Sequence, residues 1–229
     1  SLSSWLSARL PSEVQQALID QRLQAQGGGP RIAVMLLDRV GDPAAVERTL
    51  ASLQNVNLYR NLDVRVFSPA VEDGALVCRL NLAIADLDSD WLVLVEAGVE
   101  FTSSGLLIAA LDLIGAPDSC QAVYADEVMR LEAGELGLSL RPDLNLDLLL
   151  SFPAAMSRHW LYRRAGFLEL GGFAEEFDQA FELEYQLRLI ERQGLGCAGH
   201  ISEPLLVSCA FDLRDDAQER AVIEPHLWA

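Results

Sequence analysis

The chain has 229 residues, 51% of them hydrophobic, and a formal net charge of −17 at pH 7. This size allows one sizeable core, so we expect one main domain. Binding to nucleic acids or anionic membranes relies on clustered Lys and Arg, and the chain has no basic run, which argues against a nucleic-acid partner. No apolar stretch reaches 18 residues and no signal-like N-terminus is present, so we expect no transmembrane segment and a cytoplasmic location.

The cysteines and histidines predict no structural metal site. None of the four cysteines has a CxxC spacing, and each stands beside apolar or small residues, which favours buried free thiols. The three histidines form no HxxxH pattern and no Cys/His pairs, so a structural zinc ion is not expected.

Helical and strand patterns alternate along the chain, which favours an α/β architecture. Residues 12–25 predict an amphipathic helix that packs on the side of the domain, and the glycine-rich break at residues 26–30 separates it from the main fold. The chain starts with Ser and ends in a helical pattern, so we expect a piece of a longer protein with further domains. The expected parts are a helical extension (residues 1–29), the main domain (30–210) and a C-terminal helix (211–229).

The main domain begins with a predicted parallel βαβ unit. The apolar run at residues 32–37 is typical of a buried strand, and Asp42 and Pro43 provide an N-cap and first-turn proline for the following helix. Residues 63–67 predict the second strand, reached by a right-handed crossover. The later predicted elements are helices at 77–85, 104–114, 168–173 and 181–193, strands at 91–95, 122–124 and 158–162, and a hairpin with Gly134 at its turn.

Three segments carry a resemblance to a known family. The first is the apolar strand at residues 91–98, which ends in Glu-Ala-Gly and is preceded by Asn81. The second comprises Tyr-Ala-Asp-Glu at 124–127 and Arg-Pro-Asp-Leu-Asn-Leu-Asp-Leu-Leu-Leu-Ser at 141–151. The third combines Tyr-Arg-Arg at 162–164 and Gly-Gly-Phe at 171–173 with the helical run at 181–188. Together they resemble the family 2 glycosyltransferases of the GT-A fold, over roughly residues 31–207. The resemblance implies a Rossmann-like, mixed and mostly parallel sheet flanked by helices.

The family's chemistry tells which side chains to look for. A nucleotide-sugar carries an anionic diphosphate, which a divalent metal, manganese or magnesium, bridges through carboxylates at the end of a strand. The metal stabilises the charge on the leaving nucleoside diphosphate. A separate carboxylate takes the proton from the acceptor hydroxyl as it attacks the sugar.

The resemblance implies a set of donor-side residues. Glu96 stands at the first acid of the family's Asp-x-Asp motif and Glu100 is a substitute second ligand, with ordinary surface acids as the alternative for both. Asp38 falls near the family's nucleotide contact, with a loop or capping role as the alternative. Asn81 matches an Asn that precedes the motif, and Asp126 is implied to bind the donor sugar, with a strand-end cap as the alternative.

The resemblance also implies catalytic and acceptor residues. Glu182 aligns with the catalytic base and Glu184 with the acid two residues later; on a helix they point about 200° apart, so only one faces the cleft. We favour Glu182 as the base, with a solvated helix acid as the alternative. Glu127 and Trp160 are implied on the acceptor side, with a strand-end cap and core packing as their alternatives.

Two functions follow from the resemblance. The first is an inverting hexosyltransferase domain that moves a sugar from a nucleotide-sugar to a saccharide or protein acceptor. The second is a catalytically degenerate domain that serves as a binding or interaction module in a larger glycosylation protein. It follows from three substituted donor positions: Gly98 at the second motif acid, Val207 at a metal-binding His, and no acid at the end of the second strand. A dinucleotide-binding domain is disfavoured because no GxGxxG follows a predicted strand.

Overall fold

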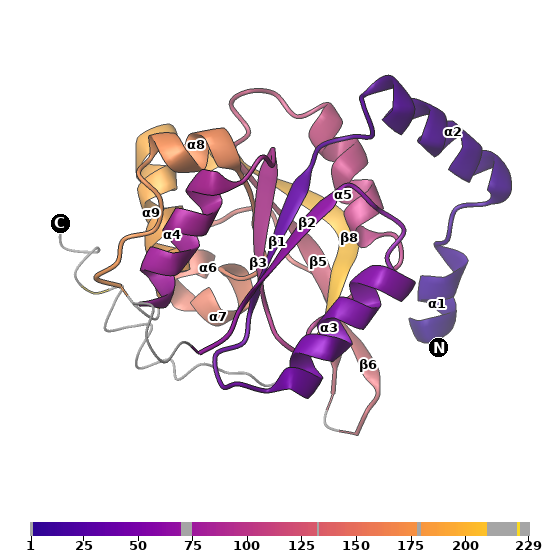
Figure 1. Cartoon of the computed structure of the whole chain (residues 1–229), viewed down its shortest axis with the longest axis horizontal. Coiled ribbons are helices and arrows are strands. Elements are labelled where there is room, and N and C mark those ends of the chain that lie inside the picture. Colours follow the sequence, from indigo (N-terminus) through magenta and orange to yellow (C-terminus); the bar gives the residue numbers. More distant parts are fainter. Residues whose placement is uncertain (1, 70–74, 132, 178–179, 210–223, 225–229) are drawn as a thin grey trace.

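The structure is a computed structural model and describes residues 2–69, 75–131, 133–177, 180–209 and 224. Within these ranges a β-sheet carries helices on both faces (Figure 1). The strands are β1 (Ile32–Leu37), β2 (Leu62–Phe67), β3 (Trp91–Glu96), β4 (Glu100–Phe101), β5 (Ala122–Arg130), β6 (Leu136–Ser139), β7 (Leu161–Arg163) and β8 (Ala198–Cys209). The helices are α1 (Leu2–Ala8), α2 (Glu13–Ala25), α3 (Pro43–Asn55), α4 (Leu76–Asp86), α5 (Gly105–Ile114), α6 (Leu146–Ser151), α7 (Pro153–Met156), α8 (Arg164–Glu169), α9 (Phe181–Gln193) and the 3-10 turn η1 (Leu195–Cys197).

The first three strands form the predicted parallel part of the sheet. β1 lies between β2 and β3 and is parallel to both, so Leu37, Phe67 and Glu96 stand side by side at the carboxyl ends. Helix α3 connects β1 to β2, with Asp42 as its N-cap and Pro43 in its first turn. The βαβ unit is therefore confirmed, and the chain leaves β1, β2 and β3 at one edge of the sheet.

The other strands make the sheet mixed. The strand order is β2-β1-β3-β7-β5-β8-β4, and β6 forms the predicted hairpin with β5 around Gly134. Among the described residues, the three longest strand pairings, β1 with β2, β1 with β3 and β5 with β8, are parallel, and the four shorter ones are antiparallel. The mixed, mostly parallel α/β fold is therefore confirmed, with β7 entering antiparallel between β3 and β5.

Three elements differ from their predicted bounds. The strand expected over residues 122–124 continues to Arg130 as β5. The strand expected over residues 158–162 starts only at Leu161, because His159 has a φ of 58° and this left-handed conformation interrupts the extended chain. The helix expected over residues 168–173 instead spans Arg164–Glu169, and two glycines with positive φ follow it.

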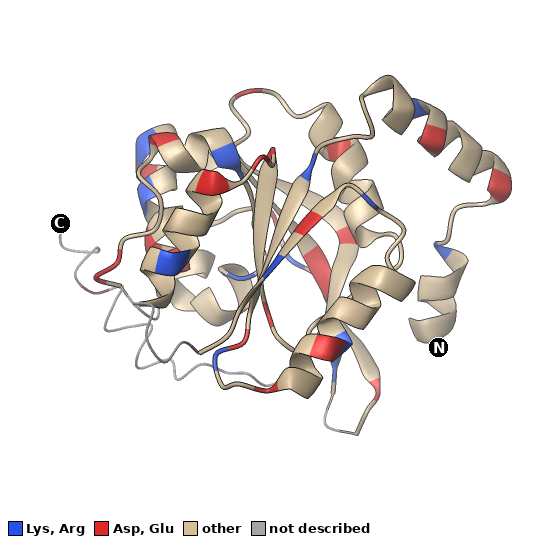
Figure 2. Ribbon diagram, viewed as in Figure 1, with Lys and Arg blue, Asp and Glu red and all other residues tan. Residues whose placement is uncertain are grey.

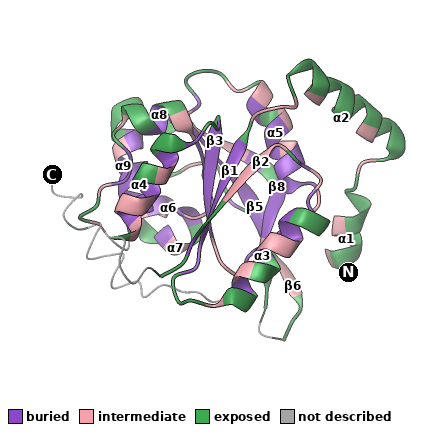
Figure 3. Ribbon diagram, in the orientation of Figure 1, coloured by how far each residue is buried: buried purple, intermediate pink, exposed green. Residues whose placement is uncertain are grey.

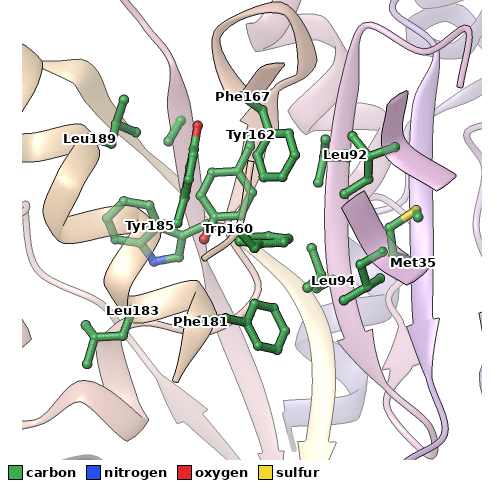
Figure 4. Packing of buried hydrophobic residues seen from close by; sticks show 14 of the residues in the cluster. Met35, Leu92, Leu94, Trp160, Tyr162, Phe167, Phe181, Leu183, Tyr185 and Leu189 are labelled. Atoms are coloured by element: carbon green, nitrogen blue, oxygen red, sulfur yellow. The ribbon is translucent and has the colours of Figure 1, made fainter. Parts of the chain in front are cut away.

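A separate hydrophobic cluster covers each face of the sheet. Successive residues of β1 point to opposite faces: Ile32 and Val34 pack with α3 and α5, whereas Ala33 and Met35 pack with α4 and α9. Figure 3 shows that burial concentrates in the strands and along the inward sides of the helices. The second face holds an aromatic group that includes Trp160 (Figure 4).

Helix α9 has the predicted bounds, and Gly194, with a φ of 78°, follows it. Leu183, Leu187 and Ile190, whose spacing predicts an inward-facing side, are buried. The buried surface is wider than the sequence predicts, because every residue from 181 to 190 except Arg188 is buried. Glu182 and Glu184 are therefore both inside the protein and not on a solvated helix face.

The N-terminal helix α2 forms as predicted but packs less than expected. Val14 and Leu18 are exposed, and no residue of α2 is buried. Only Ile19 and Leu23 pack against the core cluster beneath α5. Figure 1 shows α2 at the periphery of the molecule. The predicted C-terminal helix at residues 211–229 lies outside the described residues, apart from residue 224.

The described cysteines agree with the sequence. Cys120 and Cys197 are buried free thiols, and Cys78 is a half-buried one. Burial raises the pKa of Cys197 to about 11. The side chain of Cys209 is not among those described. None of the helices in the described ranges combines the length and apolar character that crossing a bilayer requires.

Candidate functional site

Asp38, the first residue after β1, holds its own loop together. Its Oδ1 accepts hydrogen bonds from the backbone N–H groups of Gly41 (2.8 Å) and Asp42 (2.9 Å), and Oδ2 accepts one from the Ser68 hydroxyl (3.3 Å). The N–H groups of Asp42 and Gly41 lower the pKa of Asp38. This geometry matches the loop-capping alternative and joins the loop after β1 to the end of β2.

Asn81 on α4 binds the backbone of a distant turn. Its Nδ2 donates to the carbonyl oxygen of Phe173 at 2.8 Å, and the N–H of Phe173 donates to Oδ1 at 3.0 Å. A Cβ at Gly172 would lie 2.8 Å from the same Oδ1, so the turn approaches α4 closely. Arg188 fixes this turn from α9 by donating to the carbonyl oxygen of Gly172 at 2.7 Å. Two segments of the family resemblance therefore meet through Asn81.

Replacing Asn81 by Ala should lower the free energy of unfolding by about 1–3 kcal/mol, because the N–H and carbonyl of Phe173 lose their partner. Urea denaturation measures this loss. Leu82→Ala is the matched control, since Leu82 is the next residue of α4 and is exposed, and it should change stability by less than about 0.5 kcal/mol. Equal losses for the two variants would contradict the role assigned to Asn81.

An ion pair joins the ends of β1 and β3. The Nε of Arg39 lies 3.1 Å from Oε1 and 3.3 Å from Oε2 of Glu96, and both side chains are partly exposed. The guanidinium carbon of Arg39 also lies 5.8 Å from the ring centre of Phe181, the first residue of α9. The sequence indicated Glu96 but not Arg39, although an arginine in the loop that follows the first strand of such a sheet was a signal for it.

Glu182 lies in the first turn of α9, next to Phe181, and is 9% exposed. The hydroxyl of Tyr162, on β7, donates to its Oε1 at 2.8 Å, and Gln186 donates to the same hydroxyl at 2.7 Å. Burial and the charge of Glu182 raise the pKa of Tyr162 well above its usual value, so the phenol remains a donor. Figure 4 shows Tyr162 and Phe181 on the same side of the sheet.

Glu184 has a different partner. It pairs with Arg188 one helical turn later, at 2.8 Å and 2.9 Å. The two acids of α9 therefore point to different groups, as their spacing predicts: Glu182 towards Tyr162 on β7 and Glu184 along α9.

Asp126 and Glu127, at the bulge of β5, are buried in an ionic cluster. Asp126 accepts from the N–H of Arg141 and contacts His200, both at 2.9 Å. Glu127 contacts the guanidinium of Arg141 and Nδ1 of His159, both at 2.5 Å. Burial would raise the pKa of Glu127, but the charges of His159 and Arg141 outweigh it and lower this pKa to about 2. Both acids hold the segments around β5 together, but they lie within this strand and not at its end, where the strand-end alternative places them.

Trp160 is fully buried, which matches the core-packing alternative. Its ring stacks with those of Tyr124 (5.2 Å between centroids) and Tyr162 (6.4 Å), and its Nε1 donates to the carbonyl oxygen of Met156 at 2.6 Å. No face of the indole reaches solvent to receive an acceptor sugar.

The residues at the strand ends do not fit a divalent metal. Glu96 is paired with Arg39, Glu100 is paired with Arg130 of β5 at 3.1 Å, and Gly98 offers no side-chain donor. Across the part of the chain that the structure describes, no group of three or more His, Cys, Asp or Glu residues is arranged to hold a metal ion. Metal ions need several such ligands at once, so the donor set implied by the family is incomplete.

Comparison with known proteins establishes the fold of the chain. No family model and no curated protein matches the sequence. Among solved structures, Staphylococcus aureus TarS 1–349 has a TM-score of 0.56 at 12% identity, covering 82% of this chain and 68% of that one. TarS 1–349 in complex with UDP-GlcNAc has a TM-score of 0.54 at 14% identity, with coverage of 80% and 59%.

Mannosyltransferase PcManGT from Pyrobaculum calidifontis, in complex with GDP-Man and Mn2+, has a TM-score of 0.55 at 14% identity, with coverage of 82% and 59%. This chain thus spans less than two thirds of several of the proteins that it matches. At these identities the similarity establishes a shared architecture. The chain has the fold of the GT-A glycosyltransferases, as its sequence segments predict.

Proposed function

We propose that this chain is a glycosyltransferase domain that binds a nucleotide-sugar where β1, β2 and β3 end and transfers the sugar, with inversion, to a saccharide or protein acceptor. The observation that carries the proposal is the position of Glu182. Its neighbour Phe181 lies against Arg39, which follows β1 and pairs with Glu96 at the end of β3. Ligands of open α/β sheets bind outside the carboxyl ends of parallel strands, so the acid that follows Phe181 at the start of α9 is suited to catalysis.

In the proposed reaction Glu182 acts as the general base. The acceptor hydroxyl attacks the anomeric carbon as its proton passes to the carboxylate, and the bond from that carbon to the diphosphate oxygen breaks with its electron pair leaving on the diphosphate. Tyr162 donates to Oε1 of Glu182 and so orients the carboxylate. Displacement from the opposite face inverts the anomeric centre.

A catalytically degenerate binding module is the second candidate, and a specific observation favours it. Glu96 is paired with Arg39, and both polar atoms of the Asn81 amide form hydrogen bonds with the backbone of Phe173. Asp38 and Asp126 have partners too, so all four side chains expected on the donor side already have partners within the fold. In this case the domain would bind a glycan or another part of a glycosylation protein without turnover.

Calorimetric titration with UDP, GDP, UDP-GlcNAc and GDP-Man, each with and without Mn2+, separates the two functions. Binding of at least one at a Kd below about 1 mM is expected for a glycosyltransferase, because nucleotide-sugar enzymes work near such substrate levels. Absence of binding by all four, with or without Mn2+, at millimolar ligand would reject the enzyme and leave the binding module.

A further inference from the structure

Arginines surround the edge of the sheet where the proposed donor would bind. Arg39 follows β1 and holds Glu96 at the end of β3. Arg79, on α4, donates from Nη1 to the carbonyl oxygen of Ser68 at 2.9 Å, immediately after β2. Asp and Glu outnumber Lys and Arg by 34 to 17 in the chain, so several guanidinium groups at one edge are notable. Figure 2 colours the Lys and Arg of the described residues blue and their Asp and Glu red.

A third arginine lies beside the position of the missing acid. Gly98, which replaces the second acid of the family's motif, has a φ of 98°, a conformation that a residue with a Cβ rarely adopts. A Cβ at this position would lie 3.5 Å from Nη2 of Arg48 on α3. A positively charged side chain thus lies beside the position where the family has a negatively charged, metal-binding carboxylate.

A diphosphate needs positive charge, and a guanidinium supplies it in a suitable form. Its planar N–H groups bind phosphate oxygens in pairs, and it keeps its charge at every accessible pH. The Arg39 and Glu96 side chains are 33% and 22% exposed, and ion pairs at such positions contribute little to stability. Arg39 can therefore exchange the carboxylate for a phosphate at small cost.

We infer that Arg39 binds the diphosphate of the nucleotide-sugar in place of a divalent metal, and that Glu96 is the internal acid which the diphosphate displaces. The inference rests on the proposed function, because it assumes that a nucleotide binds at this edge. It assigns Glu96 the opposite role from a metal ligand: the carboxylate competes with the diphosphate for Arg39.

The two roles considered for Glu96, competitor of the diphosphate and metal ligand, predict opposite effects of Glu96→Gln on nucleotide affinity. In calorimetry with UDP and GDP, the wild-type Kd should be the same in EDTA and in Mn2+. Arg39→Ala should weaken binding at least about tenfold, because a charge-assisted contact to phosphate is lost, and Glu96→Gln should tighten binding about threefold or more, because Arg39 loses its competing partner. A metal ligand at Glu96 predicts instead that Glu96→Gln weakens binding and only in Mn2+.

Arg65→Ala is the matched control, because Arg65 is also a partly exposed arginine in an ion pair, with Asp63 on β2, and it should leave the Kd unchanged. Thermal unfolding verifies that each variant folds, and Arg39→Gln replaces Arg39→Ala if the latter does not. Binding that requires Mn2+ and is lost in Glu96→Gln overturns the inference and leaves the glycosyltransferase standing. Unchanged affinity in the Arg39 variants also overturns it. No binding by the wild type in either condition overturns both proposals.

Discussion

Replacing Glu127 by Gln will lower the free energy of unfolding by about 3 kcal/mol at pH 7, because removing one partner of a buried ion pair leaves the other charge uncompensated. The side chains of Glu127, Arg141 and His159 are each no more than 5% exposed, so water cannot replace the lost carboxylate. Ser208 also loses a charged acceptor, at 3.2 Å. Urea denaturation at pH 7 measures the loss.

The same carboxylate makes stability depend on acid pH. The pKa of Glu127 falls from 4.5 to about 2 on folding, so its contribution is complete above about pH 4.5 and is lost as the pH falls towards 2. The sign follows because below pH 4.5 the unfolded chain binds a proton that the folded chain does not. The wild type should lose on the order of 3 kcal/mol over this window through Glu127, and Glu127→Gln should lack this part of the loss.

Comparing the two proteins between pH 7 and pH 2.5 isolates this effect. The difference in unfolding free energy between wild type and Glu127→Gln should shrink as the pH falls. Glu191→Gln, which changes an exposed acid of α9, serves as the control and should track the wild type throughout. Parallel curves for wild type and Glu127→Gln would show that the cluster around Glu127 does not hold the charge assigned to it.

The sequence predicted the parts of the fold that depend on local pattern. The apolar run of β1 is buried at every residue, and the apolar spacing of α9 gave its bounds because hydrophobic periodicity follows the geometry of the element. Local pattern could not predict the interruption at His159. Its left-handed backbone accompanies a contact with Glu127, 32 residues earlier in the chain, and no neighbouring residue signals it.

The candidate site was harder to predict, because position in a motif does not determine what a polar side chain contacts. Asn81 and Asp126 stand where the family resemblance places donor contacts, yet Asn81 binds a turn 92 residues later and Asp126 binds Arg141 and His200. These partners emerge only when the chain is folded. Arg39 was not predicted as a site residue, because the family pattern places acidic side chains, and not basic ones, at the strand ends.

Substitution of Glu182 distinguishes the two candidate functions, because only the glycosyltransferase needs this carboxylate for turnover. Glu182→Gln should reduce turnover by about 10²–10⁴-fold, because an amide cannot accept the acceptor's proton. The variant should still fold, since the amide oxygen of Gln can accept the hydrogen bond that Tyr162 now donates to Oε1. Nucleotide affinity should be unchanged, which separates a lost base from a lost binding site.

The measurement is the release of nucleoside diphosphate from whichever nucleotide-sugar binds the wild type, followed by chromatography. Glu184→Gln is the matched comparison, because Glu184 lies in the same helical turn and pairs with Arg188. It should lower stability through Arg188, which also holds the carbonyl oxygens of Leu170 and Gly172, but folded protein should keep its turnover. If Glu182→Gln turns over like the wild type while Glu184→Gln does not, the base is Glu184. If both match a measurable wild-type rate, neither acid of α9 is the base and the proton leaves by another route.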